Sequence, residues 1–224
     1  MTRLEVKKNK NEEYLIFKGK SPLKTKMGNQ ISTYNLKSAK KIICEIKKNN
    51  VEKENNFFNF LFYSNDIDNK QRIIIEKNIT KFTDTDLVFY RANSGSELES
   101  IQKKFWDPFI KYYEESFNIK LKVCNSIMPI KQVDSYYKKI KKFLKSLNKY
   151  DITVLFFLVE LTNSIVISFI VLNKNMSIDQ IWKAISIEEK YNEKKWGIDQ
   201  EANQKLLLKK KIFTDIINFK NIFK

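Results

Sequence analysis

Residues 152–172 read ITVLFFLVELTNSIVISFIVL. A stretch this long and apolar either spans a membrane or lies buried inside the protein. It is about as long as a membrane-spanning helix. Glu160 stands near its middle, however, and the polar residues Thr162, Asn163 and Ser164 follow directly. A central charge costs roughly 2.5–3.5 kcal/mol on insertion into a bilayer. We therefore expect no membrane insertion, and we predict a helix buried on all sides within a helical domain.

The N-terminal part of the chain has the pattern of a small β-rich unit. Residues 4–6 and 14–17 read as short strands on either side of residues 9–11, which form a plausible hairpin turn. Residues 35–49 repeat apolar side chains at helical spacing. This pattern predicts an amphipathic helix that covers one side of the sheet.

The remainder of the chain is expected to be helical. With 4 glycines and 3 prolines in 224 residues, the composition favours helices over a many-stranded β architecture. Residues 49–56 are polar and lack periodicity, and so they are the candidate boundary. The predicted fold class is thus α+β: a β-rich unit with one helix over residues 1–54, then a larger all-helical domain over residues 55–224.

Apolar periodicity and capping signals place the helices of this second domain. They are expected at residues 57–67 and 70–82, from Ser96, at about 134–147, from Ser177, and from about Asp199. In the helix predicted at residues 70–82, the core candidates are Ile73, Ile74 and Ile79. Pro108 predicts a kink or break in the helix that starts at Ser96. The aromatic-rich residues 57–63 are a candidate interface on whichever side is exposed.

The charge of the chain invites a nucleic-acid-binding interpretation, because the formal net charge is +16. Nearly all of that charge is lysine, since Arg3, Arg72 and Arg91 are the only arginines. Arginine is the residue favoured where phosphate or guanine is gripped in a bidentate way. The scarcity of arginine therefore argues against nucleic-acid binding, and no nucleic acid is expected as a partner. A Lys-rich nucleic-acid-binding protein is kept only as the alternative function.

The sequence lacks the residues of several catalytic classes. It has no histidine, which excludes histidine general bases, histidine metal sites and Ser-His or Cys-His nucleophiles. Cys44 and Cys124 are far apart and have no metal-ligand spacing. No phosphate-binding loop or nucleotide fingerprint is present. We expect no enzyme activity, no cofactor and no metal.

Residues 83–92 read TDTDLVFYRA, and Gln102 and the run WDP at residues 106–108 follow shortly after. The run contains two carboxylates and an arginine, namely Asp84, Asp86 and Arg91, which together could form an acid/base site or a phosphate site. A structural interpretation is simpler: Thr83 or Asp84 caps a helical turn, and Arg91 pairs with a carboxylate. We favour the structural interpretation, and we expect Trp106 to anchor its helix in the core.

This run resembles the signature of the ATP12 family, close to T-D-L-L-x-Y-R-A and then Q-x-x-x-W-D-P. The run FKGKSPLKT at residues 17–25 is similar to the family's L-D-G-R-P-L-x-T-P, although Ser21 and Lys26 depart from it. The resemblance spans about residues 15–205. It identifies these signature residues, with structural roles: Asp84, Asp86, Tyr90, Arg91, Trp106, Asp107 and Pro108.

A second block, residues 186–202, reads SIEEKYNEKKWGIDQEA and resembles the family's L-E-E-x-[FWY]-Q-x-x-x-W-G-x-D-x-E-A. Asn192 replaces the usual glutamine. The resemblance implies that an acidic residue near the Trp-Gly pair is functionally important, and the candidate partner-binding residues are Glu188, Glu189, Trp196, Asp199 and Glu201. Their structural alternatives are an N-cap for Asp199, a core position for Trp196, and a helix C-terminus at Gly197.

The resemblance implies a function in assembly. The family's chaperones help to build the F1 part of ATP synthase, and by analogy this chain would hold the unassembled F1 α subunit until the β subunit arrives. The protein would act as a monomer. Residues 1–20 show neither a secretory signal nor a transit-peptide pattern, so we expect the bacterial cytoplasm, or the mitochondrial matrix if the source is eukaryotic.

Overall fold

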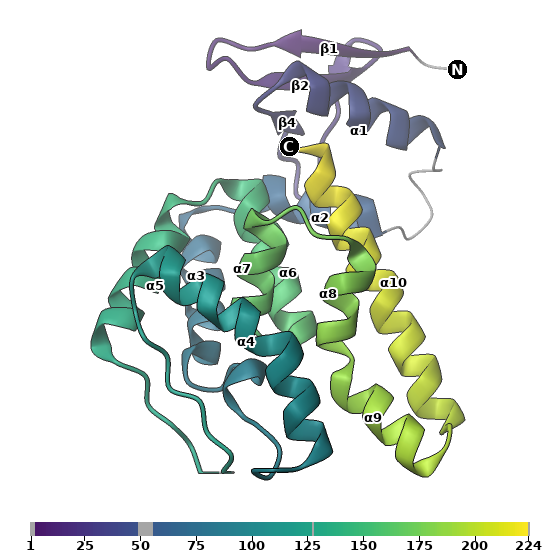
Figure 1. The fold of residues 1–224 in the computed structure, drawn as a ribbon. Helices are drawn as coiled ribbons and strands as arrows, with labels where there is room; N and C mark the ends of the chain where they lie inside the picture. The colour runs from purple at the N-terminus through teal and green to yellow at the C-terminus, as the bar shows by residue number, and fades with distance from the viewer. Residues whose placement is uncertain (1–2, 49–55, 127, 224) are drawn as a thin grey trace.

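The computed structural model describes residues 3–48, 56–126 and 128–223. A small antiparallel sheet and one helix stand at one end of the molecule, and a helical domain forms the rest (Figure 1). The strands are β1 (Leu4–Lys8), β2 (Tyr14–Lys18), β3 (Ser21–Pro22) and β4 (Ser32–Thr33), followed by α1 (Leu36–Lys48). The predicted α+β fold class is confirmed.

The N-terminal hairpin forms where the pattern predicted it. Strand β1 pairs antiparallel with β2 in a register that sets Val6 opposite Ile16, and β2 also pairs with β3 and β4. In the turn, the side chain of Asn9 accepts hydrogen bonds from the backbone N–H groups of Asn11 and Glu13. Helix α1 then packs on the sheet and buries Ala39 and Ile42.

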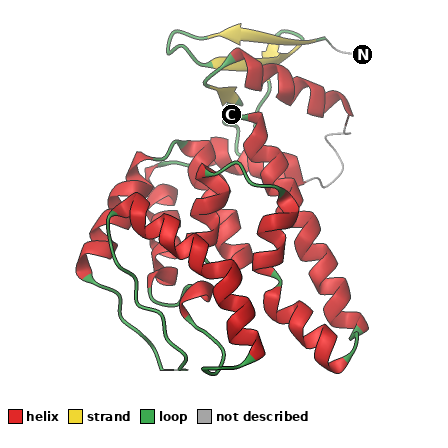
Figure 2. Ribbon diagram, in the orientation of Figure 1, coloured by secondary structure: helices red, strands yellow, loops and turns green. Residues whose placement is uncertain are grey.

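The second domain is built from helices, as Figure 2 shows by colour. They are α2 (Asn56–Asp66), α3 (Asn69–Thr80), α4 (Glu97–Phe117), α5 (Asp134–Ser146), α6 (Lys149–Thr162), α7 (Ile165–Asn173), α8 (Ile178–Ile185), α9 (Ile187–Trp196) and α10 (Gln200–Ile222). Two 3₁₀ turns, η1 (Lys81–Thr83) and η2 (Leu87–Phe89), lie between α3 and α4. The domain boundary predicted at residues 54/55 falls outside the described residues.

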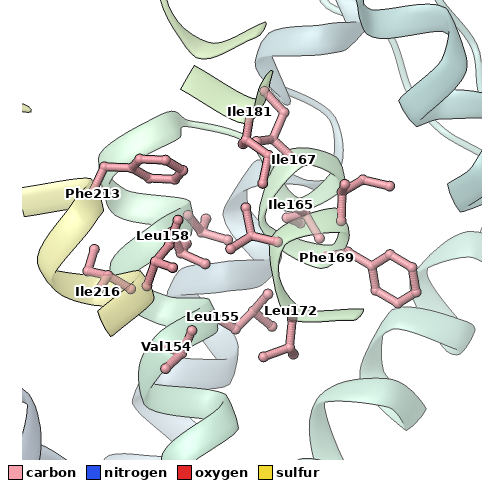
Figure 3. Close-up of a cluster of buried hydrophobic side chains, with 14 of the residues drawn as sticks. Val154, Leu155, Leu158, Ile165, Ile167, Phe169, Leu172, Ile181, Phe213 and Ile216 are labelled. Atoms are coloured by element: carbon pink, nitrogen blue, oxygen red, sulfur yellow. The ribbon is translucent and has the colours of Figure 1, made fainter. Parts of the chain in front are cut away.

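The prediction of one helix at residues 152–172 is wrong, because the stretch folds into α6 and α7. Asn163 adopts a left-handed conformation with φ of 54° and ends α6, and the Ser164 hydroxyl accepts from the Ile167 N–H to cap α7. The two helices therefore pack against each other in the core (Figure 3). No helix of the described part of the chain is long and apolar enough to cross a membrane.

Three smaller expectations for the helical domain need correction. Ile73 and Ile74 are 67% and 58% exposed, because Ile75 and Ile79 occupy the buried face of α3. Helix α4 continues through Pro108, so the predicted break is absent, while the alternative of a kink stays a prediction. Buried side chains on both sides of Pro108 hold the two halves in the core, which offsets the loss of one backbone hydrogen bond.

Three aromatic side chains of α2 belong to the core, while Phe62 and Tyr63 are partly buried. Phe57, Phe58 and Phe60 are buried, and the Phe60 ring packs against Phe157 and Phe219 at 4.8 and 5.6 Å between centroids. Helix α2 thereby connects α6 and α10, with which it makes extensive contact. The interface hypothesis for residues 57–63 is therefore not supported for these three side chains.

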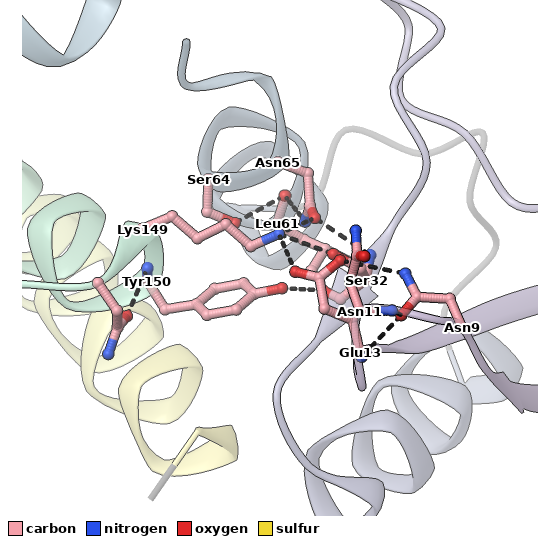
Figure 4. A network of polar contacts seen from close by, with 10 residues as sticks. Asn9, Asn11, Glu13, Ser32, Leu61, Ser64, Asn65, Lys149 and Tyr150 are labelled. Atoms are coloured by element: carbon pink, nitrogen blue, oxygen red, sulfur yellow. Dashed lines mark hydrogen bonds and ion pairs between the residues drawn. The ribbon is translucent and has the colours of Figure 1, made fainter. Parts of the chain in front are cut away.

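Polar contacts join the β-rich unit to the helical domain (Figure 4). The Lys149 ammonium donates to the Ser32 hydroxyl at 2.8 Å and to Asn65 Oδ1 at 3.0 Å, and the Tyr150 hydroxyl donates to the Ser32 carbonyl. At the other end of the chain, the Ser38 hydroxyl donates to the Ile222 carbonyl at 2.7 Å. The N-terminal unit is thus held by both α6 and the end of α10.

Candidate partner-binding surface

The signature carboxylates contact different parts of the structure. The Asp84 carboxylate accepts from the Tyr137 hydroxyl at 2.6 Å and from the Gln132 N–H at 3.0 Å, which holds α5 and the segment before it. Asp86 is fully buried and accepts from the Val88 N–H at 3.1 Å and the Val166 N–H at 3.0 Å. Each carboxylate is thus used to join segments of the chain, and the two do not form a shared acid/base pair.

Arg91 lies with Trp106 and Asp107, as the structural interpretation predicted. Its guanidinium Nη2 donates to Asp107 Oδ1 at 2.7 Å, and its carbon stands 4.9 Å from the centre of the Trp106 ring. The Arg91 side chain is 2% exposed and that of Asp107 is 58% exposed. Burial lowers the pKa of Arg91, and Asp107 and Glu99 partly offset that effect. Within the described residues, Nε and Nη1 of Arg91 are buried without a hydrogen-bond partner.

This arrangement predicts that the two partners of the ion pair differ in their effect on stability. Asp107→Ala leaves the buried guanidinium without its hydrogen-bonded carboxylate, and it should lower the free energy of unfolding by about 2–3 kcal/mol. Arg91→Met removes the buried charge and leaves only an exposed carboxylate, so it should change stability by less than about 1 kcal/mol. Urea unfolding of both variants measures the difference. Equal losses would contradict this assignment.

Gln102 connects the signature run to α9. Its side-chain oxygen accepts from the Ala92 N–H at 2.8 Å, and its side-chain nitrogen donates to Glu188 Oε1 at 2.9 Å. Desolvation by the surrounding chain raises the pKa of Glu188, and the hydrogen bond from Gln102 opposes that shift. Of the candidate acidic residues, Glu188 is therefore the one tied directly to the signature.

The other predicted carboxylates are spread over two helices and do not gather in one loop. Glu189 on α9 pairs with Lys209 at 3.3 Å, and Glu201 on α10 pairs with Lys205 at 2.6 Å. Asp199 caps α10, because its Oδ1 accepts from the Ala202 N–H at 2.9 Å. The predicted N-cap is confirmed. The four candidate carboxylates therefore do not share one surface loop, because the loop is only the short turn between α9 and α10.

Trp196 and Ile198 project from that turn. They are 77% and 67% exposed, so a core position for Trp196 is excluded. Gly197 between them has a φ of 87°, which ends α9 in a conformation that favours glycine. Figure 1 shows this turn at the end of the helical domain far from the sheet. We call Trp196 and Ile198 the hairpin patch.

A shallow groove runs from the hairpin patch between α9 and α10. It has a volume of about 230 Å³, and its lining includes Glu189, Glu193, Asp199 and Leu206. Exposed tryptophan beside an apolar groove with acidic side chains suits a protein contact, because tryptophan is enriched among the residues that dominate binding energy. Among the described residues, no group of side chains could hold a metal ion.

Sequence reasoning missed Ile198 and the exposed pair Leu207 and Leu208 of α10, which are 60% and 58% exposed. A signal for the leucines was present. Leu206, Leu207 and Leu208 are consecutive, and three consecutive residues of a helix cannot all face one side. Leu206 takes the buried position.

The family model for the ATP12 chaperone protein matches residues 2–114 of this chain. A curated relative, the mitochondrial protein atp12 of Schizosaccharomyces pombe, is 22% identical over 142 residues, which are 60% of this chain and 48% of the relative. The match thus spans about half the length of that relative. The block at residues 186–202 lies beyond the residues that the family model matches.

Two solved structures have the same fold. The structure of Atp12 from Paracoccus denitrificans superposes with a TM-score of 0.87 at 19% identity, and the match covers 99% of this chain and 96% of that one. A candidate chaperone from Agrobacterium tumefaciens gives a TM-score of 0.86 at 17% identity, with coverage of 100% and 85%. At these identities the structures establish the fold and not the details of binding.

Proposed function

The chain belongs to the family of ATP12 chaperone proteins, and from this premise we propose that it holds the unassembled α subunit of F1 ATP synthase until the β subunit joins. The observation that carries the proposal for a binding surface is the exposed Trp196 of the hairpin patch. We propose that the protein acts as a monomer and without catalysis, in the compartment where F1 is assembled: the cytoplasm of a bacterium or the mitochondrial matrix of a eukaryote.

Such a chaperone is needed because of the surface that its unassembled client exposes. An unassembled subunit exposes the apolar surface meant for its neighbour, and an exposed apolar patch of that size promotes aggregation. Trp196 and Ile198 offer apolar area to cover it, while Glu189, Glu193 and Asp199 along the groove can meet basic side chains at its edge. Release requires only that β binds the same surface of α more tightly.

The first test is capture of separately produced F1 subunits by the tagged chaperone. We expect the α subunit to be retained and the β subunit to pass through. Retention of neither subunit would overturn the proposal. The same column should retain little nucleic acid at physiological salt; strong, salt-dependent retention would favour the alternative of a Lys-rich nucleic-acid-binding protein.

Trp196→Ala combined with Ile198→Ser tests the hairpin patch. Both side chains are mostly exposed, so the variant should keep the melting temperature of the wild type within a few degrees. Its affinity for α should fall by at least about tenfold, because a buried tryptophan anchor contributes about 2 kcal/mol or more to an interface.

The matched control changes Ile73 and Ile74 to serine. These two side chains are exposed to a similar degree on α3, away from the hairpin. We expect this control to bind α as the wild type does. If both double variants bind like the wild type while α is still captured, the contact lies elsewhere on the chaperone.

A further inference from the structure

A second groove lies on the other side of α9, against α4. Its volume is about 240 Å³, and an apolar cavity of about 150 Å³ already holds a benzene ring. The groove therefore has room for one large apolar side chain. We call it the α4–α9 groove. Its apolar lining consists of Ile101, Phe105, Ile187 and Tyr191.

Lysines surround this apolar floor. Lys183, Lys190 and Lys194 all line the groove, and no carboxylate lines it. Lys190 and Lys194 form exposed ion pairs with Glu193 and Glu97, and such pairs contribute little and exchange readily. Among the described residues, Lys183 is not part of an ion pair, unlike its two neighbours in the groove. The edge of the groove is therefore basic and able to accept new carboxylates.

Helix α9 thus has grooves of opposite character on its two sides. Its α10 side carries Glu189, Glu193 and Trp196, whereas its α4 side carries Lys190, Tyr191 and Lys194. Glu189, Glu193 and Trp196 follow one another at helical spacing, and so do Lys190 and Lys194. Lys190 and Glu193 stand where the two sides meet and form an ion pair at 2.5 Å. Carboxylates line one groove and lysines line the other, so the two grooves favour ligands of different charge.

We propose that the α4–α9 groove docks a protein partner through one apolar side chain flanked by carboxylates. The apolar side chain would cover Phe105, Ile187 and Tyr191, and the flanking carboxylates would meet Lys183, Lys190 and Lys194. Burial in the groove supplies affinity, and the lysines supply steering and register. The assignment rests on the groove alone and holds whether or not the F1 α subunit is the client of the hairpin patch.

Selection from a random peptide library on the immobilised full-length protein tests the proposal. The enriched peptides should share an aromatic or aliphatic residue with Asp or Glu on both sides. Their affinity should fall at least about tenfold in the triple variant Lys183→Glu, Lys190→Glu, Lys194→Glu. A second variant, Tyr191→Ser, should weaken the same peptides without any change in charge.

The matched control carries Lys138→Glu, Lys142→Glu and Lys145→Glu on the exposed face of α5, which changes the net charge by the same amount. We expect it to bind the peptides within about threefold of the wild type at physiological salt. Circular dichroism confirms that each variant is folded. The proposal is overturned if no peptide with this pattern is enriched, or if both triple variants weaken binding equally. Capture of the α subunit is measured separately, so failure here leaves that result unaffected.

Discussion

Replacing Trp106 with alanine is expected to lower the free energy of unfolding by about 3–5 kcal/mol, as for other large buried aromatic residues. Trp106 is 0% exposed, and its indole Nε1 donates to the Ala184 carbonyl at 2.8 Å. Alanine leaves a cavity between α4 and α8, and that carbonyl loses its donor. Because small domains are stable by about 5–15 kcal/mol, the variant should be partly unfolded at 37 °C or close to it. Urea unfolding followed by far-ultraviolet circular dichroism measures the loss.

Trp106→Phe separates the two contributions. Phenylalanine keeps most of the apolar volume but cannot donate to Ala184, so it should lose about 1–3 kcal/mol. The ring also supports the guanidinium of Arg91, which a phenyl group can still do. An unchanged melting temperature for Trp106→Ala, with loss of partner binding, would instead assign Trp106 to an interface.

The sequence was sufficient to predict the fold class and the pairing of Arg91 with a carboxylate. The cap predicted at Thr83 or Asp84 is wrong, because Asp86 caps η2 and the Asp84 carboxylate bonds to Tyr137 and Gln132. Periodicity predicted α1 and α5 closely, and the capping signal at Ser177 is a complete capping box in the structure. The split between α6 and α7 was missed, although the signal was present. Asn163 tolerates the left-handed conformation and Ser164 is a good N-cap, but the apolar residues on both sides concealed the break.

The position of the candidate site was harder to predict than its residues. Trp196 and Trp106 look alike in sequence, yet one is exposed and the other is fully buried. The difference depends on which helices cover each ring, and these come from distant parts of the chain. The α4–α9 groove was not predicted for the same reason, because its lining joins residues about 90 positions apart.

Asp86→Ala is expected to lower the free energy of unfolding by about 2–4 kcal/mol at pH 4. The Asp86 carboxyl group accepts from the Val88 N–H of η2 and the Val166 N–H in the first turn of α7, and it lies beside the Ser164 hydroxyl. Removing it leaves buried donors without an acceptor, at about 1–3 kcal/mol for each group. Asp86 therefore fastens the signature run to the junction of α6 and α7.

The pH dependence of this loss tests the assignment further. Burial raises the pKa of Asp86 from its ordinary value of 3.8 to about 6, although hydrogen bonds from Ser164, Val166 and Val88 oppose that shift. Between pH 3.8 and about pH 6, Asp86 thus binds its proton more tightly in the folded state than in the unfolded state. The stability that Asp86 contributes is complete below about pH 4 and declines as the pH rises through 6, by about 3 kcal/mol in total.

The difference in unfolding free energy between the wild type and Asp86→Ala should therefore shrink from pH 4 to pH 7. The chain has no histidine, and burial raises the pKa of Tyr113 and Tyr136 still further above this range. Carboxyl groups that titrate alike in both proteins, Glu188 included, cancel in the difference. A difference that grows with pH would mean that the backbone donors outweigh burial and that Asp86 is held as a charged anchor.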